Sequence, residues 1–177
     1  MMKISLGIFL LVSGMGLTAC TASAQRGDGE QAEAIPMVAE LLYGSAQCGY
    51  LDDMARVSLI DTVPQLEAAY RGFQKHVMGA APVTLPAVDF KREWVVLLEM
   101  GRRPTLGYRL ALNSMAPQII NRHLEVVVDW IEPGRNMAVG EMLTSPCLLL
   151  KLPKGPYQTV LFKDQNGMRK AILDIPQ

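Results

Sequence analysis

Short apolar runs separated by turns fill the second half of the chain, and this pattern limits the fold more than any other feature of the sequence. Residues 94–100 are almost all apolar, as in a strand whose two faces are both buried. Asn166-Gly167 stands between the last two runs and favours a hairpin, because both residues tolerate positive φ. Comparable β-like runs cover residues 38–46, 56–60, 108–114, 124–131, 143–152, 159–163 and 168–175. Many short strands with regular turns predict a mainly β fold, either a β-sandwich or a partly open barrel.

One segment departs from the β pattern and is predicted to form a single amphipathic helix. Thr62 is expected to be its N-cap, with Gln65 three residues later completing a capping box. Gly79 is expected to end the helix, since glycine favours the residue after a C-terminus. The apolar residues that recur at helical spacing are Leu66, Tyr70, Phe73 and Val77. We therefore expect one helix that buries this stripe against the β-sheet.

The chain begins with a segment of the kind that directs secretion. Residues 1–19 carry one early cation, Lys3, then an apolar run and small residues, and they are too short for a convincing membrane-spanning helix. Residues 17–20 read LTAC, which resembles the lipobox of bacterial lipoproteins. The resemblance implies cleavage before Cys20, a diacylglycerol on its sulfur and an acylated amino group. The alternative is an ordinary signal peptide that is cut after residues 22–24.

The charge of the chain fits attachment through lipid rather than through a basic surface. Seventeen basic residues balance seventeen acidic ones, and residues 1–19 contribute only Lys3 to the basic set. A nucleic-acid-binding surface would show as a basic excess, so nucleic acid is not expected as a partner. The lipobox resemblance implies a lipid-anchored protein of the cell envelope. Thr21, where Asp would retain a lipoprotein in the inner membrane, favours the outer membrane if the source is Gram-negative.

Beyond the lipobox, the sequence predicts a tether followed by one domain. Residues 20–35 are small, polar and aperiodic, as in a flexible linker, and residues 36–177 are expected to form a single β-rich domain. Once Cys20 is acylated, Cys48 and Cys147 are the two cysteines that remain. Because the compartment outside the cytoplasm is oxidising, we expect them to form a disulfide. Two separate buried thiols are the alternative.

The sequence carries no familiar catalytic or metal-binding motif. GxSxG, HExxH, a P-loop and CxxC are all absent from it. Its two histidines, His76 and His123, have no His, Cys or carboxylate nearby at metal-ligand spacing. The sequence therefore predicts a protein that is not an enzyme, with no catalytic residue, no metal and no cofactor.

The stretch GRRPTLGY at residues 101–108, between two predicted strands, is the best candidate for a binding site. Pro104 presets φ for a turn, Thr105 can bond its own backbone, and Gly107 can take positive φ. In this interpretation Leu106 is an exposed apolar knob with arginines beside it that also point outward. The residues predicted to contact a partner are Arg102, Arg103, Pro104, Thr105, Leu106, Gly107 and Tyr108. The alternative is a stiff hairpin whose side chains are merely long.

Two motifs in a fixed order resemble a known family. The PTLGY turn follows a strand of Val and Leu, and the segment LTSPCLLLKLPKG comes later. This order is similar to the C-terminal domain of PrcB-type protease-complex subunits, over about residues 89–154. Leu106 stands where that family often has a second glycine, and Cys147 where it often has an aromatic residue. The turn also resembles, more faintly, that of chagasin-type inhibitors of cysteine proteases, which are β-sandwiches.

The PrcB resemblance implies binding or assembly rather than catalysis. We therefore expect a lipid-anchored cell-envelope domain that binds a protein partner such as a protease, as an accessory subunit of a protease or secreted complex. One alternative is a protease inhibitor that acts through residues 102–108. A third possibility is a structural or ligand-binding lipoprotein of the envelope.

Overall fold

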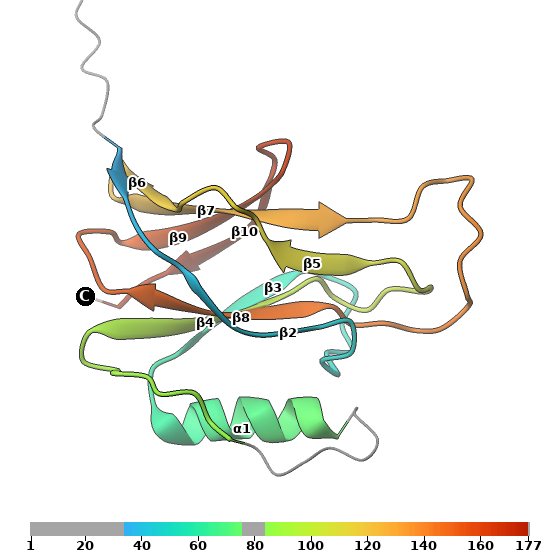
Figure 1. The fold of residues 1–177 in the computed structure, drawn as a ribbon, viewed down its shortest axis with the longest axis horizontal. Coiled ribbons are helices and arrows are strands. Elements are labelled where there is room, and N and C mark those ends of the chain that lie inside the picture. Colours follow the sequence, from blue (N-terminus) through green and yellow to red (C-terminus); the bar gives the residue numbers. More distant parts are fainter. Residues whose placement is uncertain (1–33, 76–83, 177) are drawn as a thin grey trace, which may run out of the picture. The chain divides into compact units, whose positions relative to one another are not determined.

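The computed structural model describes residues 34–75 and 84–176, which contain two β-sheets and one helix, α1 (Val63–Gln74) (Figure 1). The strands of this part of the chain are β1 (Ile35–Pro36), β2 (Glu40–Ser45), β3 (Arg56–Ile60), β4 (Glu93–Glu99), β5 (Arg109–Leu112), β6 (Gln118–Ile120), β7 (His123–Ile131), β8 (Cys147–Pro153), β9 (Thr159–Asp164) and β10 (Arg169–Asp174). The mainly β fold with a single helix that the sequence predicts is confirmed for the described residues.

The strands divide between two separate sheets. One sheet has the order β2-β8-β4-β3 and is antiparallel throughout. The other has the order β1-β6-β7-β9-β10, and β5 also pairs with the second half of β7. Within it the β7–β9 pair is parallel, because the chain visits the other sheet between these two strands. The described residues therefore form a sandwich-like arrangement of two open sheets rather than a closed barrel.

The core between the sheets is built from strands whose inward residues are fully buried. Along β7 the buried positions alternate with half-buried ones, as in a strand with one covered face. The core residues of β7 are Leu124, Val126, Val128 and Trp130, and they pack with Val96, Leu98, Leu148, Leu150, Val160 and Phe162 from β4, β8 and β9. This face-to-face packing of the two sheets is the main apolar core of the described structure.

A second apolar cluster covers the outer face of the four-stranded sheet. Leu66 and Phe73 of α1 pack against Val95, Leu97 and Leu149 on β4 and β8. Figure 1 shows α1 lying across this face, with the β2-β8-β4-β3 sheet between it and the other sheet. Because β4 and β8 are covered on both faces, their sequences read as unbroken apolar runs rather than as alternating ones.

The helix starts where predicted, but the capping box is wrong. Thr62 is the N-cap residue with extended backbone, yet its side chain makes no capping hydrogen bond. Gln65 Oε1 instead accepts the N–H of Asp61, at 2.9 Å, which is one residue earlier than a capping box requires. The predicted end, Gly79, lies outside the described residues, as does His76. No helix in the described part is long and apolar enough to cross a membrane.

Two short strands, β1 and β6, are not predicted from the sequence. They pair with each other, Ile35 opposite Ile119, and are too short to show a period. The turn between β6 and β7 places Asn121 at φ 50° and Arg122 at φ 66°, although arginine gives no signal for positive φ. In the Asn166-Gly167 turn, where both residues were expected to tolerate positive φ, only Gly167 adopts it. The two turns show that residue type alone does not fix which backbone positions turn left-handed.

The two cysteines of the β-rich part are bonded, as predicted. Cys48 follows β2 and Cys147 begins β8, and these two strands pair with Ser45 opposite Cys147. The Cα atoms of the cysteines lie 6.0 Å apart, and the bond joins positions separated by 99 residues. The disulfide therefore ties the loop after β2 to the start of β8.

We predict that the double variant Cys48→Ala, Cys147→Ala lowers the free energy of unfolding by up to about 4–5 kcal/mol, the chain-entropy value for a closed loop of this length. Alanine is chosen because both positions are buried. Urea unfolding with and without a thiol reductant measures the effect. The reductant should destabilise the wild type and leave the double variant unchanged. Two free thiols in non-reduced peptides of the native protein would contradict the assignment.

Candidate functional site

Residues 101–108 connect the two sheets rather than two neighbouring strands. β4, which precedes them, pairs with β3 and β8, while β5, which follows them, pairs with β7 in the other sheet. The alternative of a stiff hairpin is therefore wrong, because the two flanking strands are not hydrogen-bonded to each other. The stretch crosses from one sheet to the other at the end of the strands where β4 and β7 finish.

Two further loops reach the same end and bond to this crossing. Residues 46–55 connect β2 to β3, and residues 132–146 connect β7 to β8. Arg103 and Thr144 exchange two backbone hydrogen bonds of 2.8 Å, and the N–H of Arg102 donates to the carbonyl of Asp52 at 2.7 Å. We call residues 46–55, 101–108 and 132–146 together the loop platform.

Two glycines allow the loops of the platform to approach closely. Gly101 has φ 92°, and a Cβ atom there would lie 2.6 Å from the carbonyl oxygen of Asp53. Gly107 has φ 97°, and a Cβ atom there would lie 3.2 Å from Pro133 and 3.3 Å from Val139. Positive φ at Gly107 confirms the sequence prediction. The requirement at Gly101 was not predicted, because it comes from a loop distant in sequence.

Ser145 fixes the first platform loop at its base. Its buried hydroxyl accepts the N–H groups of Cys48, at 3.0 Å, and of Gly49, at 2.8 Å. The Cys48–Cys147 disulfide lies beside these bonds. Residues 145–147, Ser-Pro-Cys, were noted in the sequence only as part of the family resemblance. In the structure they hold residues 46–55 in place through the Ser145 hydroxyl and the disulfide.

Arg102 is exposed, in agreement with the outward orientation expected from the sequence. Its Nε donates to Oδ1 of Asp53 at 2.9 Å, and this hydrogen bond raises the pKa of Arg102 above its usual range. The ion pair links the crossing to residues 46–55 across the outer surface of the platform. Because both groups remain in contact with water, the pair contributes little to stability.

Arg103 does not point outward, and this expectation is wrong. Its Nη2 donates to the carbonyl of Met100 at 2.7 Å, and its Nη1 donates to the carbonyls of Asp53 at 3.2 Å and Arg102 at 3.3 Å. The guanidinium also lies 5.9 Å from the ring centre of Tyr108, which is half-buried. The guanidinium of Arg103 thus bonds to backbone carbonyls at the start of the crossing, and Arg103 is half-buried.

The remaining residues predicted to contact a partner differ in exposure. Pro104 is exposed, and Thr105 is half-buried with its carbonyl accepting the Thr144 hydroxyl at 3.2 Å. Leu106 is 39% exposed, and its backbone N–H donates to Gly140. A Cβ atom at Gly140 would lie 3.0 Å from Leu106 Cδ1, so the predicted knob rests on the neighbouring loop.

The platform collects exposed apolar side chains. Among the described residues, six of the thirteen large hydrophobic side chains that are exposed belong to its three loops: Leu51, Met54, Leu106, Met137, Met142 and Leu143. These side chains lie on three loops that are joined by backbone hydrogen bonds. The sequence did not predict this cluster, because only Leu106 stood out in it. Exposed apolar side chains concentrated on loops that bond to one another are typical of an interaction site.

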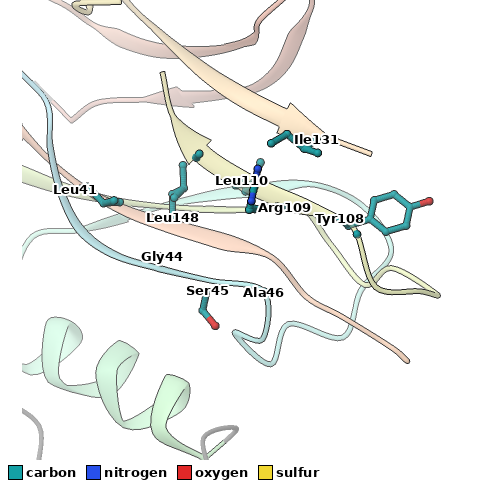
Figure 2. A pocket seen from close by; sticks show the side chains of 11 residues that line it. Leu41, Gly44, Ser45, Ala46, Tyr108, Arg109, Leu110, Ile131 and Leu148 are labelled. Carbon is teal, nitrogen blue, oxygen red and sulfur yellow. The ribbon is translucent and has the colours of Figure 1, made fainter. Parts of the chain in front are cut away.

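A groove adjoins the platform at the side of the sandwich. Its volume is about 580 Å³, and it lies between β2 of one sheet and β5 of the other (Figure 2). Gly107 and Tyr108 of the crossing line its platform end. The other residues that line it are Leu41, Gly44, Ser45, Ala46, Arg109, Leu110, Ala111, Ile131 and Leu148. The groove and the platform therefore form one continuous surface.

The buried carboxylates and the buried tyrosine hydroxyl of the described residues have structural partners, whereas Arg103 Nε is buried without a hydrogen-bond partner. Glu99 pairs with Arg56 at 2.5 Å, and Asp164 pairs with Lys170 at 3.1 Å. Burial raises the pKa of Tyr157 to about 12, and its hydroxyl donates to a backbone carbonyl at 2.7 Å. No group of three His, Cys, Asp or Glu side chains in this part of the chain is arranged to hold a metal ion.

We predict that Arg103→Ala lowers the free energy of unfolding by about 1–3 kcal/mol, since it removes the side-chain donor to the carbonyl of Met100 in a part-buried hydrogen bond. Arg102→Ala, the matched control at the next position, should cause a much smaller loss, because its side chain is exposed. Urea unfolding of both variants checks this. Equal losses for the two would contradict the structural role assigned to Arg103.

A family model matches the segment of the chain that contains most of the platform. Residues 94–153, about a third of the chain, match the family model described as PrcB C-terminal. No curated protein and no solved structure matches the chain. The matched segment runs from β4 through β8 and includes two of the three platform loops. Residues 94–153 thus match the PrcB C-terminal family, which confirms the resemblance seen in the sequence.

Proposed function

We propose that this protein is a lipid-anchored, non-catalytic domain of the cell envelope that binds a protein partner through the loop platform. The observation that carries the proposal is the gathering of exposed apolar side chains on three loops that are fixed to one another. A pre-ordered apolar surface loses little conformational entropy when a partner covers it, so more of the burial energy contributes to affinity.

The family match supports a partner of a particular kind. A PrcB-type domain is associated with a protease complex as an accessory part, and the matched residues supply most of the platform. We therefore favour a protease, or another subunit of a protease complex, as the protein that is bound. The role of the domain would be to hold or place that protein rather than to take part in cleavage.

The geometry favours an accessory subunit over an inhibitor. An inhibitor of the chagasin type would need residues 102–108 to protrude as a wedge that can enter a protease cleft. Here the crossing is bonded to Thr144 on one side, and Leu106 rests on Gly140. This arrangement presents a broad surface made of three loops, which suits docking against another surface.

The described part of the chain begins at the end of β7 that lies away from the platform. Cys20 itself lies outside the described residues. The first described strand, β1, pairs with β6 next to the start of β7, whereas the platform lies where β7 ends (Figure 1). The nine residues of β7 span roughly 26 Å at the usual rise per residue.

We predict that Cys20→Ser releases the protein from the membrane fraction or stalls its processing, since serine cannot accept the thioether-linked lipid. Membrane fractionation, with mass measurement of the N-terminus, checks both outcomes. Cys48→Ser is the control, because it removes a cysteine without touching the lipobox. A normally processed Cys20→Ser protein that stays in the membrane would refute the anchoring proposal.

We predict that Met137→Asp weakens partner binding by about tenfold or more, because an unpaired carboxylate would have to be buried in an apolar interface. Met115→Asp is the matched control: Met115 lies between β5 and β6, outside the platform, and is 61% exposed against 62% for Met137. Neither exposed substitution should change stability by more than about 0.5 kcal/mol.

Affinity purification of the full chain from its own membrane, followed by mass spectrometry, identifies the partner for this comparison. The platform proposal fails if Met137→Asp and Met115→Asp bind that partner equally well. If the partner is a protease, its activity in the complex separates the two roles. Full activity supports an accessory subunit, and slowed cleavage supports the inhibitor alternative.

A further inference from the structure

The groove beside the platform lies between two strand edges that are unpaired in the described structure. β2 pairs only with β8, and β5 pairs only with β7, so the second edge of each strand has no hydrogen-bonded partner strand, although β2 and β5 lie close to each other. Figure 2 shows the groove between these two edges, with β8 behind it. A free strand edge is a template for another extended chain.

The pairing of β5 shows which of its backbone groups are free. The N–H of Asn113 donates to the carbonyl of Val127, so every second residue of β5 bonds toward β7. Trp130, opposite Leu110, bonds instead to the side chain of Gln165 through both its N–H and its carbonyl. The backbone groups of Leu110 and Leu112 therefore face away from β7, on the unpaired side of the strand.

The floor of the groove is apolar, and β2 carries a glycine, Gly44, beside it. A Cβ atom at Gly44 would lie 3.2 Å from Leu148 Cδ2, so any side chain at this position would press on the floor. Leu110 and Leu148 are buried beneath the groove, and Leu41 is 47% exposed at its edge. The space thus suits one apolar side chain that enters from outside.

The positive charge of Arg109 indicates which kind of ligand the groove would bind. It lines the groove, is exposed, and makes no ion pair or side-chain hydrogen bond within the described part of the chain. Its cross-strand neighbour on β7 is Ile131, which cannot neutralise it. An unpaired guanidinium next to free backbone groups favours an extended chain that carries a carboxylate.

We propose that this groove receives an extended segment of the protein partner. The segment adds a strand to the free edge of β5, buries one apolar side chain against Leu110 and Leu148, and pairs an acidic side chain with Arg109. The proposal rests on the proposed function and makes it more specific: the platform binds the surface of the partner, and the groove binds a strand-forming acidic segment of it.

A library of random twelve-residue peptides displayed on phage tests the groove directly. Selection on the purified full chain should enrich peptides that alternate apolar residues with Asp or Glu, and synthetic copies should bind in solution. Ala46→Trp, which fills the groove from an exposed position, should weaken their binding by about tenfold or more. Arg109→Glu should weaken it about two- to fivefold or more, as expected for loss of a partly exposed ion pair.

Arg169→Glu is the matched control for the charge. Arg169 is also an exposed arginine at the start of an edge strand of the same sheet, β10, but it does not line the groove. It should leave binding unchanged, and a peptide with Lys in place of its acidic residue should regain affinity for Arg109→Glu. Lack of any enriched peptide, equal effects of the two arginine variants, or unchanged binding to Ala46→Trp would overturn the proposal.

The natural partner separates failure of this proposal from failure of the proposed function. Arg109 lines the groove but lies outside the platform, so Arg109→Glu is the groove variant for this comparison. Weaker partner binding by both Met137→Asp and Arg109→Glu supports both proposals. If Met137→Asp loses the partner and Arg109→Glu binds it with unchanged affinity, the groove proposal is overturned while the platform proposal stands. If Met137→Asp keeps the partner, the proposed function is overturned whatever Arg109→Glu does.

Discussion

The burial of β4 and β8 on both faces is the constraint on which the other features of this domain depend. One face packs on the second sheet and the other on α1, so these two strands carry the apolar core of the described structure. Because they lie in the middle of their sheet, the strands on either side, β2 and β3, become its edges. The loops at the end of β4 and the start of β8 are thereby fixed at their bases, and the platform is built from them.

The sequence predicted those parts of the fold whose cause is local. Residues 94–100 and 56–60 read as strands because their own side chains are apolar or alternate, and β4 and β3 lie there. The positive φ at Gly107 was predictable for the same reason, as a property of one residue. The disulfide was predictable from the number of cysteines and from the oxidising compartment that the N-terminal sequence predicts, without any knowledge of strand order.

What the sequence did not predict depends on partners that are distant along the chain. Whether residues 101–108 form a hairpin or a crossing is decided by which strands β4 and β5 pair with, and no local pattern encodes this. The sequence wrongly predicted that Arg103 points outward. Its hydrogen-bond acceptors are backbone carbonyls of folded loops, and the sequence does not show where these carbonyls lie. The apolar side chains of the platform come from three loops, so they form a cluster only in the folded chain.

The Cys48–Cys147 disulfide affects when the loop platform reaches its final structure. Residues 46–55 are held to β8 by this bond and by the hydroxyl of Ser145. A disulfide forms in oxidising surroundings and does not persist in a reducing cytoplasm. If the chain is exported as proposed, a newly made copy carries this loop without its covalent hold until export, and the proposed binding surface matures only on the far side of the membrane. Such timing would keep the domain from engaging the proposed partner before both have reached the same compartment.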